Sequence, residues 1–129
     1  MQLSSKEIER LKKESAQRSG CWEIDWGPEP MSQWNENIED QLSLTLVVHQ
    51  ESYYILETFV SPLDAVNKGI SAFVNATKKL MTLPETILVR DKTLMNELLP
   101  LATALGCEIK ISRLKAIPQI RRDMKRFMF

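Results

Sequence analysis

The chain has 129 residues, 43% of them hydrophobic, and its 17 basic and 17 acidic side chains give a net charge of zero. A chain of this length forms one domain with a hydrophobic core and is too short for two. No apolar run approaches the roughly 18 residues that a membrane span needs, and the amino terminus is too polar for a signal peptide. We therefore expect a cytoplasmic protein that does not contact a membrane. The neutral charge also argues against a dedicated nucleic-acid-binding protein, because such proteins bind mainly by neutralising phosphates.

Metal and thiol chemistry have few candidates. The two cysteines, Cys21 and Cys107, lie far apart in the sequence, so we expect free, structural thiols in a reducing compartment and no cysteine-based zinc site. His49 is the only histidine. Because it ends a predicted strand beside a turn, we expect it to be exposed and not to bind a metal.

The charges are unevenly distributed along the chain. Nine acids and no lysine or arginine lie between Cys21 and Asp64, whereas seven basic residues and one acid lie between Lys110 and Arg126. Two interpretations stay open. The acids could form a site that faces a basic nucleic-acid groove, or the two ends of a small domain could simply attract each other.

Residues 4–19 predict a helix, so that residues 1–20 would form a peripheral amino-terminal segment separate from a single domain over residues 21–129. A capping-box pattern at Ser4 and Glu7 begins this helix, and Gly20 ends it. The next residues, Cys21–Trp26, predict a strand. Its apolar side chains Trp22, Ile24 and Trp26 share one face, and Cys21, Glu23 and Asp25 share the other.

A polar loop carrying Trp34 leads to two strands, Leu42–His49 and Tyr53–Val60, which are rich in β-branched and aromatic residues and predict a hairpin. Ser61 and Pro62 have the residue types of a helix N-cap and first helical position. We therefore expect a helix from Ser61 to about Met81. Its predicted core face consists of Val66, Ile70, Phe73, Val74, Leu80 and Met81.

The remaining residues predict strands and helices in alternation. In chain order these are a strand over Thr86–Asp91, a helix over Thr93–Leu105 bent near Pro100, an edge strand over Cys107–Arg113 and a basic helix from about Ile117. Parallel strands joined in this way need right-handed crossovers. The predicted fold class is therefore α/β, with a mixed five-stranded sheet (three antiparallel strands, then β-α-β-α) and helices on both faces.

The same order of elements occurs in the ribonuclease H-like fold of integrase and transposase cores, which this sequence resembles from about residue 22 to 128. Trp22-Glu23-Ile24-Asp25 is similar to the Trp-x-x-Asp of the first integrase strand, and Ile87–Asp91 to the fourth strand, which ends on a second metal-binding Asp. Leu42–Val60 resembles the second and third strands, and Leu98–Ile111 the step into the fifth. The resemblance implies that the single domain over residues 21–129 is ribonuclease H-like. The sequence also resembles small bacterial domains of unknown function that share a tryptophan-acid start.

This resemblance implies a metal site. The family's sheet order, 3-2-1-4-5, would place Asp25 and Asp91 side by side as metal ligands, and Asp123 stands roughly where the family carries its third acid, usually Glu. With Mg²⁺ or Mn²⁺ bound, Asp25, Asp91 and Asp123 would be the catalytic residues of phosphodiester hydrolysis. Nucleic acid or another partner would then bind the basic residues near the carboxyl terminus, which are Arg113, Lys115, Arg121, Arg122, Lys125 and Arg126.

Each acid also has a structural interpretation. Asp25 would face solvent or bond to the turn before Gly27-Pro28, Asp91 would cap the following helix, and Asp123 would form a surface ion pair. The tryptophans are expected to pack in the core or at its edge, with the stacking of bases as the alternative.

The sequence therefore leaves two hypotheses for function. The first is a non-catalytic interaction or structural module without a cofactor, which binds an unknown protein or a second copy of itself through the carboxy-terminal helix. The second is a small nuclease that depends on Mg²⁺ or Mn²⁺. Enzymatic activity is thus left open, and nucleic acid is the less favoured partner.

Overall fold

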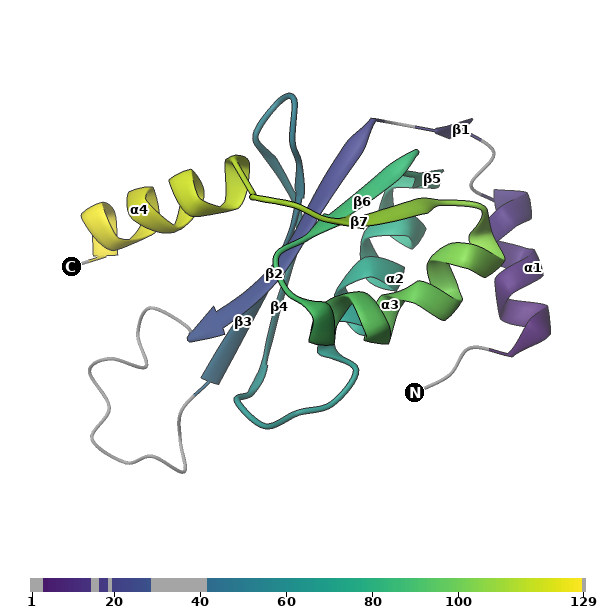
Figure 1. Cartoon of the computed structure of the whole chain (residues 1–129), viewed down its shortest axis with the longest axis horizontal. Coiled ribbons are helices and arrows are strands. Elements are labelled where there is room, and N and C mark those ends of the chain that lie inside the picture. Colours follow the sequence, from purple (N-terminus) through teal and green to yellow (C-terminus); the bar gives the residue numbers. More distant parts are fainter. Residues whose placement is uncertain (1–3, 15–16, 19, 29–41, 129) are drawn as a thin grey trace.

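The computed structural model describes residues 4–14, 17–18, 20–28 and 42–128 of the chain. Figure 1 shows a twisted sheet with helices on either side of it. Its strand order is β4-β3-β2-β6-β7. These strands are β2 (Cys21–Pro28), β3 (Leu42–His49), β4 (Tyr54–Pro62), β6 (Thr86–Val89) and β7 (Glu108–Ile111).

The sheet is mixed, as the sequence predicts. β2, β3 and β4 form an antiparallel meander, and β6 and β7 extend it from β2 as parallel strands. Three helices join or follow these strands: α2 (Lys68–Leu80), α3 (Lys92–Leu105) and α4 (Ala116–Met128). The α/β fold class with a mixed five-stranded sheet is therefore confirmed, and β2 lies at its centre.

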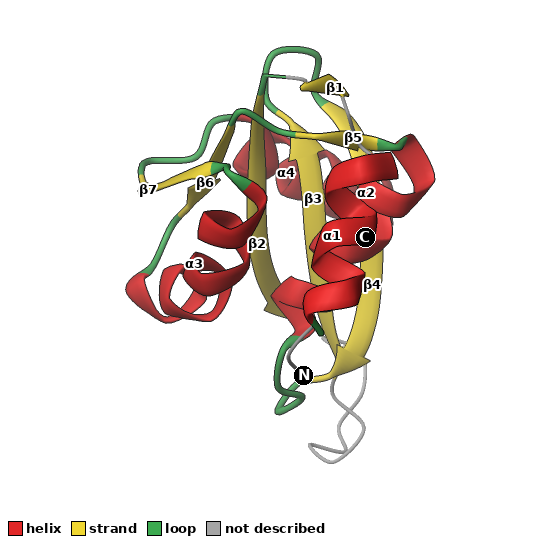
Figure 2. Ribbon diagram, turned by 90° about the vertical axis from the view of Figure 1, so that its right-hand side faces the viewer, coloured by secondary structure: helices red, strands yellow, loops and turns green. Residues whose placement is uncertain are grey.

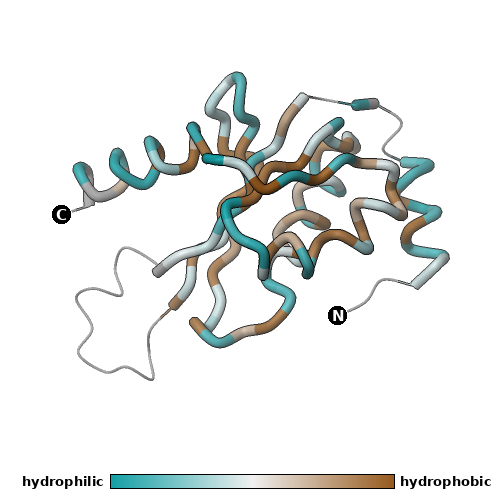
Figure 3. The backbone as a smooth tube through the Cα atoms, viewed as in Figure 1, coloured by the Kyte–Doolittle hydropathy of each residue, from teal (hydrophilic) through white to brown (hydrophobic). Residues whose placement is uncertain are grey.

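Separate hydrophobic clusters cover the two faces of the sheet. α2 and α3 pack on the face that carries Trp22 and Ile24, and α4 packs on the opposite face against β2 and β3 (Figure 2). Hydrophobic residues gather along the central strands and α3, whereas much of α4 is hydrophilic (Figure 3). Because side chains alternate along a strand, Glu23 and Asp25 of β2 face the α4 side, where both are buried.

The amino-terminal residues are attached to this core. α1 (Ser5–Glu14) packs on α2 and α3 with Leu11 buried. β1 (Gln17–Arg18) pairs in parallel with β5 (Thr82–Leu83). The helix predicted over 4–19 is therefore too long, and two-residue strands carry too little pattern to be predicted. The division of the chain at residue 20 stays a prediction.

The helix start predicted at Ser61 is wrong. β4 continues through Pro62, because Ser61 pairs with Ser43 and Pro62 pairs with Leu42 on β3. The ladder with β3 thus overrides the local capping pattern. α2 begins only at Lys68, after Asn67, whose φ of 58° lies in the left-handed region.

The late start of α2 also changes its buried face. The three predicted core residues at its centre, Ile70, Phe73 and Val74, are buried. The other three lie before the helix or at its end, and they are exposed: Val66, Leu80 and Met81.

The other predicted elements are found with ends shifted by one or two residues, including β6, α3, β7 and α4. The hairpin between β3 and β4 is confirmed. The predicted loop with Trp34 lies outside the described residues. Within the part of the chain that the structure describes, no helix is both long and apolar enough to cross a membrane.

The close approach of α2 and α3 depends on Gly69. A Cβ atom at this position would lie 2.5 Å from Cδ1 of Leu94, and Leu94 is fully buried. We expect Gly69→Ala to lower the free energy of unfolding by about 1–2 kcal/mol through overpacking, even though alanine favours helices. Urea denaturation would measure the loss, with Asn75→Ala on the exposed side of the same helix as control. Equal stability of the two variants would show that the space at Gly69 is not limiting.

Candidate functional site

Asp25 lies on the α4 face of the central strand and is 5% exposed. Its Oδ2 atom lies 3.5 Å from Nε of Arg90. β6 runs parallel to β2 with Ile24 opposite Val89, so the residue after Val89 is brought beside Asp25. Oδ1 of Asp25 is buried and has no hydrogen-bond partner among the described residues. Asp25 therefore does not face solvent, and the interpretation as an exposed acid is wrong.

A second arginine, on α4, lies near enough to act on this carboxylate by its charge, without an ion pair as short as that of Arg90. The guanidinium of Arg121 lies over Gly27, because a Cβ atom on Gly27 would be 3.0 Å from its Nη1 atom and 3.2 Å from its Cζ atom. Nη2 of Arg121 donates to the carbonyl oxygen of Leu44 at 3.4 Å. Gly27 and Asp25 share one face of β2, so the missing side chain at Gly27 makes room for Arg121 beside Asp25.

The charged side chains around Asp25 shift one another's pKa values. Burial raises the pKa of the Asp25 carboxyl group, and Arg90 and then Arg121 oppose this effect. The charge of Asp91 raises the same pKa by a smaller effect. Burial lowers the pKa of Arg121, and Asp25 opposes that shift. Asp25 and Arg121 thus compensate each other in a site with little access to water.

Asp91 caps α3. It stands at the N-cap position, and its Oδ1 atom accepts a hydrogen bond from the backbone N–H of Leu94 at 2.8 Å. Asp123 lies on α4, where its Oδ1 atom accepts from the side-chain amide of Gln119 at 3.1 Å. In residues 4–14, 17–18, 20–28 and 42–128, no three or more His, Cys, Asp or Glu side chains form a group that could hold a metal ion.

This set of side chains does not fit a divalent cation. Mg²⁺ and Mn²⁺ prefer several oxygen ligands, mainly carboxylates and water. Here Asp25 is flanked by the positive charges of Arg90 and Arg121, and Asp91 uses one carboxylate oxygen to cap α3. The metal-ligand roles of Asp25 and Asp91, and the catalytic roles of these two acids and Asp123, stay predictions.

Most of the basic residues named from the sequence lie on the surface. Arg113, Lys115, Arg122 and Arg126 are exposed, and the side chain of Lys125 lies outside the described part. Arg121 is different, because it is half-buried and faces Asp25. A role of this set in binding nucleic acid or another partner stays a prediction.

Glu23 is the buried acid whose role the sequence does not reveal. It is fully buried on the same face of β2 as Asp25. Its carboxylate accepts from the backbone N–H groups of Lys115 at 2.9 Å, Ala116 at 3.0 Å and Ile117 at 2.9 Å. The side-chain amide of Gln50 donates to it at 2.9 Å. Glu23 therefore caps the N-terminus of α4 from the middle of the sheet.

One sequence feature could have indicated this contact. Both faces of a central strand are covered, so an acid between Trp22 and Ile24 needs buried partners. The start of α4, Leu114-Lys115-Ala116, has no Ser, Thr, Asp or Asn to cap it. The free backbone N–H groups at the start of α4 and the buried carboxylate of Glu23 therefore supply each other's hydrogen-bond partners.

We expect Glu23→Gln to lower the free energy of unfolding by about 2–4 kcal/mol, because it removes the charge and turns an amide N–H group toward backbone donors. Urea denaturation would measure this loss. Glu85→Gln, at an exposed acid in the turn before β6, is the matched control. If both variants lose the same stability, Glu23 does not cap α4.

The pKa of Asp25 gives a second prediction. Because its folded pKa is raised, its contribution to stability is fully present below the ordinary value of 3.8 and is lost as pH rises through the folded pKa. Carboxyl ¹³C NMR should give a pKa above 3.8 for Asp25. Arg90→Gln should raise it further, whereas Lys92→Gln at the neighbouring exposed residue should not. A pKa at or below the ordinary value would rule out this description of the site.

Solved structures with a similar fold include retroviral integrases. The catalytic core of HTLV-2 integrase, solved in complex with magnesium in a trimeric form, has a TM-score of 0.65 and 14% identity, covering 87% of this chain and 70% of that one. The BIV integrase catalytic core gives a TM-score of 0.60 and 12% identity, covering 82% and 66%. The simian T-cell lymphotropic virus intasome, solved in complex with PP2A regulatory subunit B56 gamma, has a TM-score of 0.66 and 13% identity. This match covers 85% of this chain and 40% of that one.

These likenesses establish the fold alone, since all the identities are low. No curated protein sequence matches the chain. The family model that does match, over residues 7–125, is described as a domain of unknown function, DUF6930. The chain therefore belongs to the DUF6930 family and has the ribonuclease H-like fold of integrase catalytic cores.

Proposed function

We propose that this domain is a non-catalytic interaction module on a ribonuclease H-like scaffold. The observation that carries the proposal is the pair of guanidinium groups near Asp25, with Arg90 3.5 Å from its Oδ2 atom and Arg121 over Gly27. The resemblance to integrases implies a divalent cation at this end of the first strand. A guanidinium keeps its charge at every physiological pH and binds carboxylates well. Arg90 and Arg121 together therefore supply positive charge to Asp25 without a metal.

Access to Asp25 supports the same proposal. Metal-assisted hydrolysis needs an open position for water and for the phosphodiester. Asp25 is 5% exposed, and α4 packs over its face of the sheet with Arg121 bonded to the Leu44 carbonyl. A substrate would have to displace this arginine before it reached the carboxylate.

The partner that fits this surface is a protein with an acidic patch, or the acid-rich segment of a second copy. Four exposed basic residues lie on α4 and on the segment before it: Arg113, Lys115, Arg122 and Arg126. Cys21 and Cys107 are free thiols, which fits a reducing compartment such as the cytoplasm.

A second candidate function is a Mg²⁺- or Mn²⁺-dependent nuclease that uses Asp25, Asp91 and Asp123. One observation favours it. Oδ1 of Asp25 is a buried acceptor without a partner among the described residues, and such an atom is a natural ligand for a cation.

Thermal melts with and without millimolar Mn²⁺ distinguish the two functions. Asp91→Asn removes a carboxylate but preserves the cap, because Asn caps helices as well as Asp. Asp64→Asn, at an exposed acid outside this group, is the matched control. We expect Mn²⁺ to leave the melting temperature of all three proteins unchanged, and plasmid DNA to stay intact.

The nuclease would be supported by the opposite pattern. Mn²⁺ would then raise the melting temperature of the wild type and of Asp64→Asn but not of Asp91→Asn. DNA cleavage that is lost in Asp25→Asn would complete that result and exclude the non-catalytic module.

A further inference from the structure

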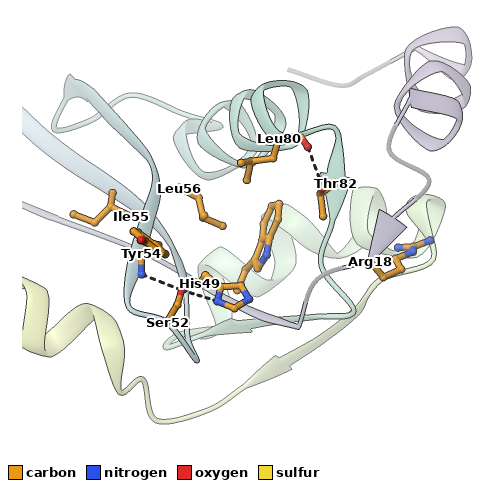
Figure 4. A pocket seen from close by; sticks show the side chains of 9 residues that line it. Arg18, His49, Ser52, Tyr54, Ile55, Leu56, Leu80 and Thr82 are labelled. Atoms are coloured by element: carbon orange, nitrogen blue, oxygen red, sulfur yellow. Dashed lines mark hydrogen bonds between the residues drawn. The ribbon is translucent and has the colours of Figure 1, made fainter.

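A pocket of about 630 Å³ opens on the face of the sheet opposite Asp25. Its walls come from the start of β2, the hairpin of β3 and β4, the end of α2, and the β1–β5 pair (Figure 4). This volume is within the range of small-molecule sites, about 300–1,000 Å³. The pocket is therefore separate from the Asp25 group and from the basic residues of α4.

A buried donor without an acceptor lines this pocket. Trp22 is fully buried, and its indole N–H has no hydrogen-bond partner among the described residues. The ring is held by an edge contact with Phe73, with 5.8 Å between the ring centroids. Because an unpaired buried N–H costs about 1–3 kcal/mol, a ligand that supplied an acceptor oxygen would gain free energy at this position.

Among the described residues that line the pocket, Arg18 carries a permanent positive charge. Its side chain is held by hydrogen bonds from Nη2 to the carbonyl of Leu105 at 3.0 Å and from Nη1 to Sγ of Cys107 at 3.3 Å. The described lining residues include no Asp or Glu. His49 is already engaged, with Nδ1 2.8 Å from Oγ of Ser52 and Nε2 3.5 Å from Oε2 of Glu51.

The rest of the wall is mainly apolar, with Tyr54 and Thr82 adding hydroxyl groups. Ile55 and Leu80 line it and are each 43% exposed. Such exposed aliphatic side chains around a buried donor suit a ligand with an apolar body and one polar end. Ile55 lies on β4, and Leu80 is the last residue of α2.

We propose that this pocket binds a small organic anion with an apolar body, of the aromatic carboxylate class. Its carboxylate accepts from the indole N–H of Trp22, and its ring contacts Ile55 and Leu80, while Arg18 lies at the edge of the pocket. The proposal is independent of the function proposed above, because the pocket lies on the opposite face of the sheet from Asp25 and shares no residue with the Asp25 group.

NMR of the ¹⁵N-labelled full chain tests the proposal with 3-phenylpropionate as the probe. After assignment of the indole signals, we expect the Nε1–H signal of Trp22 to move saturably while that of Trp26 stays in place. The neutral probe 3-phenylpropanamide keeps the ring and a carbonyl oxygen but lacks the charge. It should bind about tenfold more weakly, because charge-assisted hydrogen bonds are stronger.

A pair of matched variants tests the location. Leu80→Ala removes part of the wall and should weaken binding of the probe about fivefold. Leu63→Ala is the control, because Leu63 is also 43% exposed but does not line the pocket. Leu80→Ala should therefore weaken binding of the probe, whereas Leu63→Ala should leave it unchanged.

Four results would overturn the proposal. A Trp22 signal that does not move up to the solubility limit of the probe would leave water as its acceptor. Joint movement of all indole signals would indicate non-specific binding, and equal weakening by the two variants would place the probe elsewhere. A Trp22 signal that shifts with protein concentration in the absence of the probe would assign the pocket to a second copy of the chain.

Discussion

The arrangement of this domain depends on the hydrogen bonds between Glu23 and the first turn of α4. A carboxylate at the centre of a sheet is costly unless donors surround it. The donors in this domain are the backbone N–H groups of Lys115, Ala116 and Ile117, together with the amide of Gln50. The positive end of the helix dipole adds to their effect. The central strand of the sheet thereby fixes where the last helix begins and which face of the sheet it covers.

The position of α4 in turn determines the chemistry beside Asp25. Because the first turn of α4 is bonded to Glu23, Arg121 farther along α4 lies over Gly27. From there its charge affects the pKa of Asp25. The two acids of β2 are thus compensated in different ways, Glu23 by a helix terminus and Asp25 by arginines. In the function proposed above, these arginines take the place of the cation that the resemblance to integrases implies beside Asp25. Trp22 and the pocket that it lines lie on the opposite face of β2.

The fold can be predicted from the sequence because its main elements have strong local patterns. The two strands of the hairpin, the helix before Gly106 and the tryptophan-acid start of β2 are examples. The errors arise where tertiary contacts override local patterns. Ser61 has the residue type of an N-cap, but its pairing with Ser43 keeps it in β4. The site is harder to predict, because Arg121 looks like any other residue of a basic helix. Its role follows only from the contact of α4 with Gly27, and that contact depends on a cap 93 residues away from Ala116 in the sequence.

A double-mutant cycle between Asp25 and Arg121 would measure their mutual compensation. It compares the free energies of unfolding of the wild type, Asp25→Asn, Arg121→Met and the double variant, all in Mn²⁺-free buffer with a chelator. If Arg121 supplies the charge that compensates Asp25, the two substitutions will be coupled by about 1–3 kcal/mol. A coupling energy below about 0.5 kcal/mol, the usual limit for independent sites, would show that Arg121 does not compensate Asp25, and the arginine could then not stand in for a metal ion.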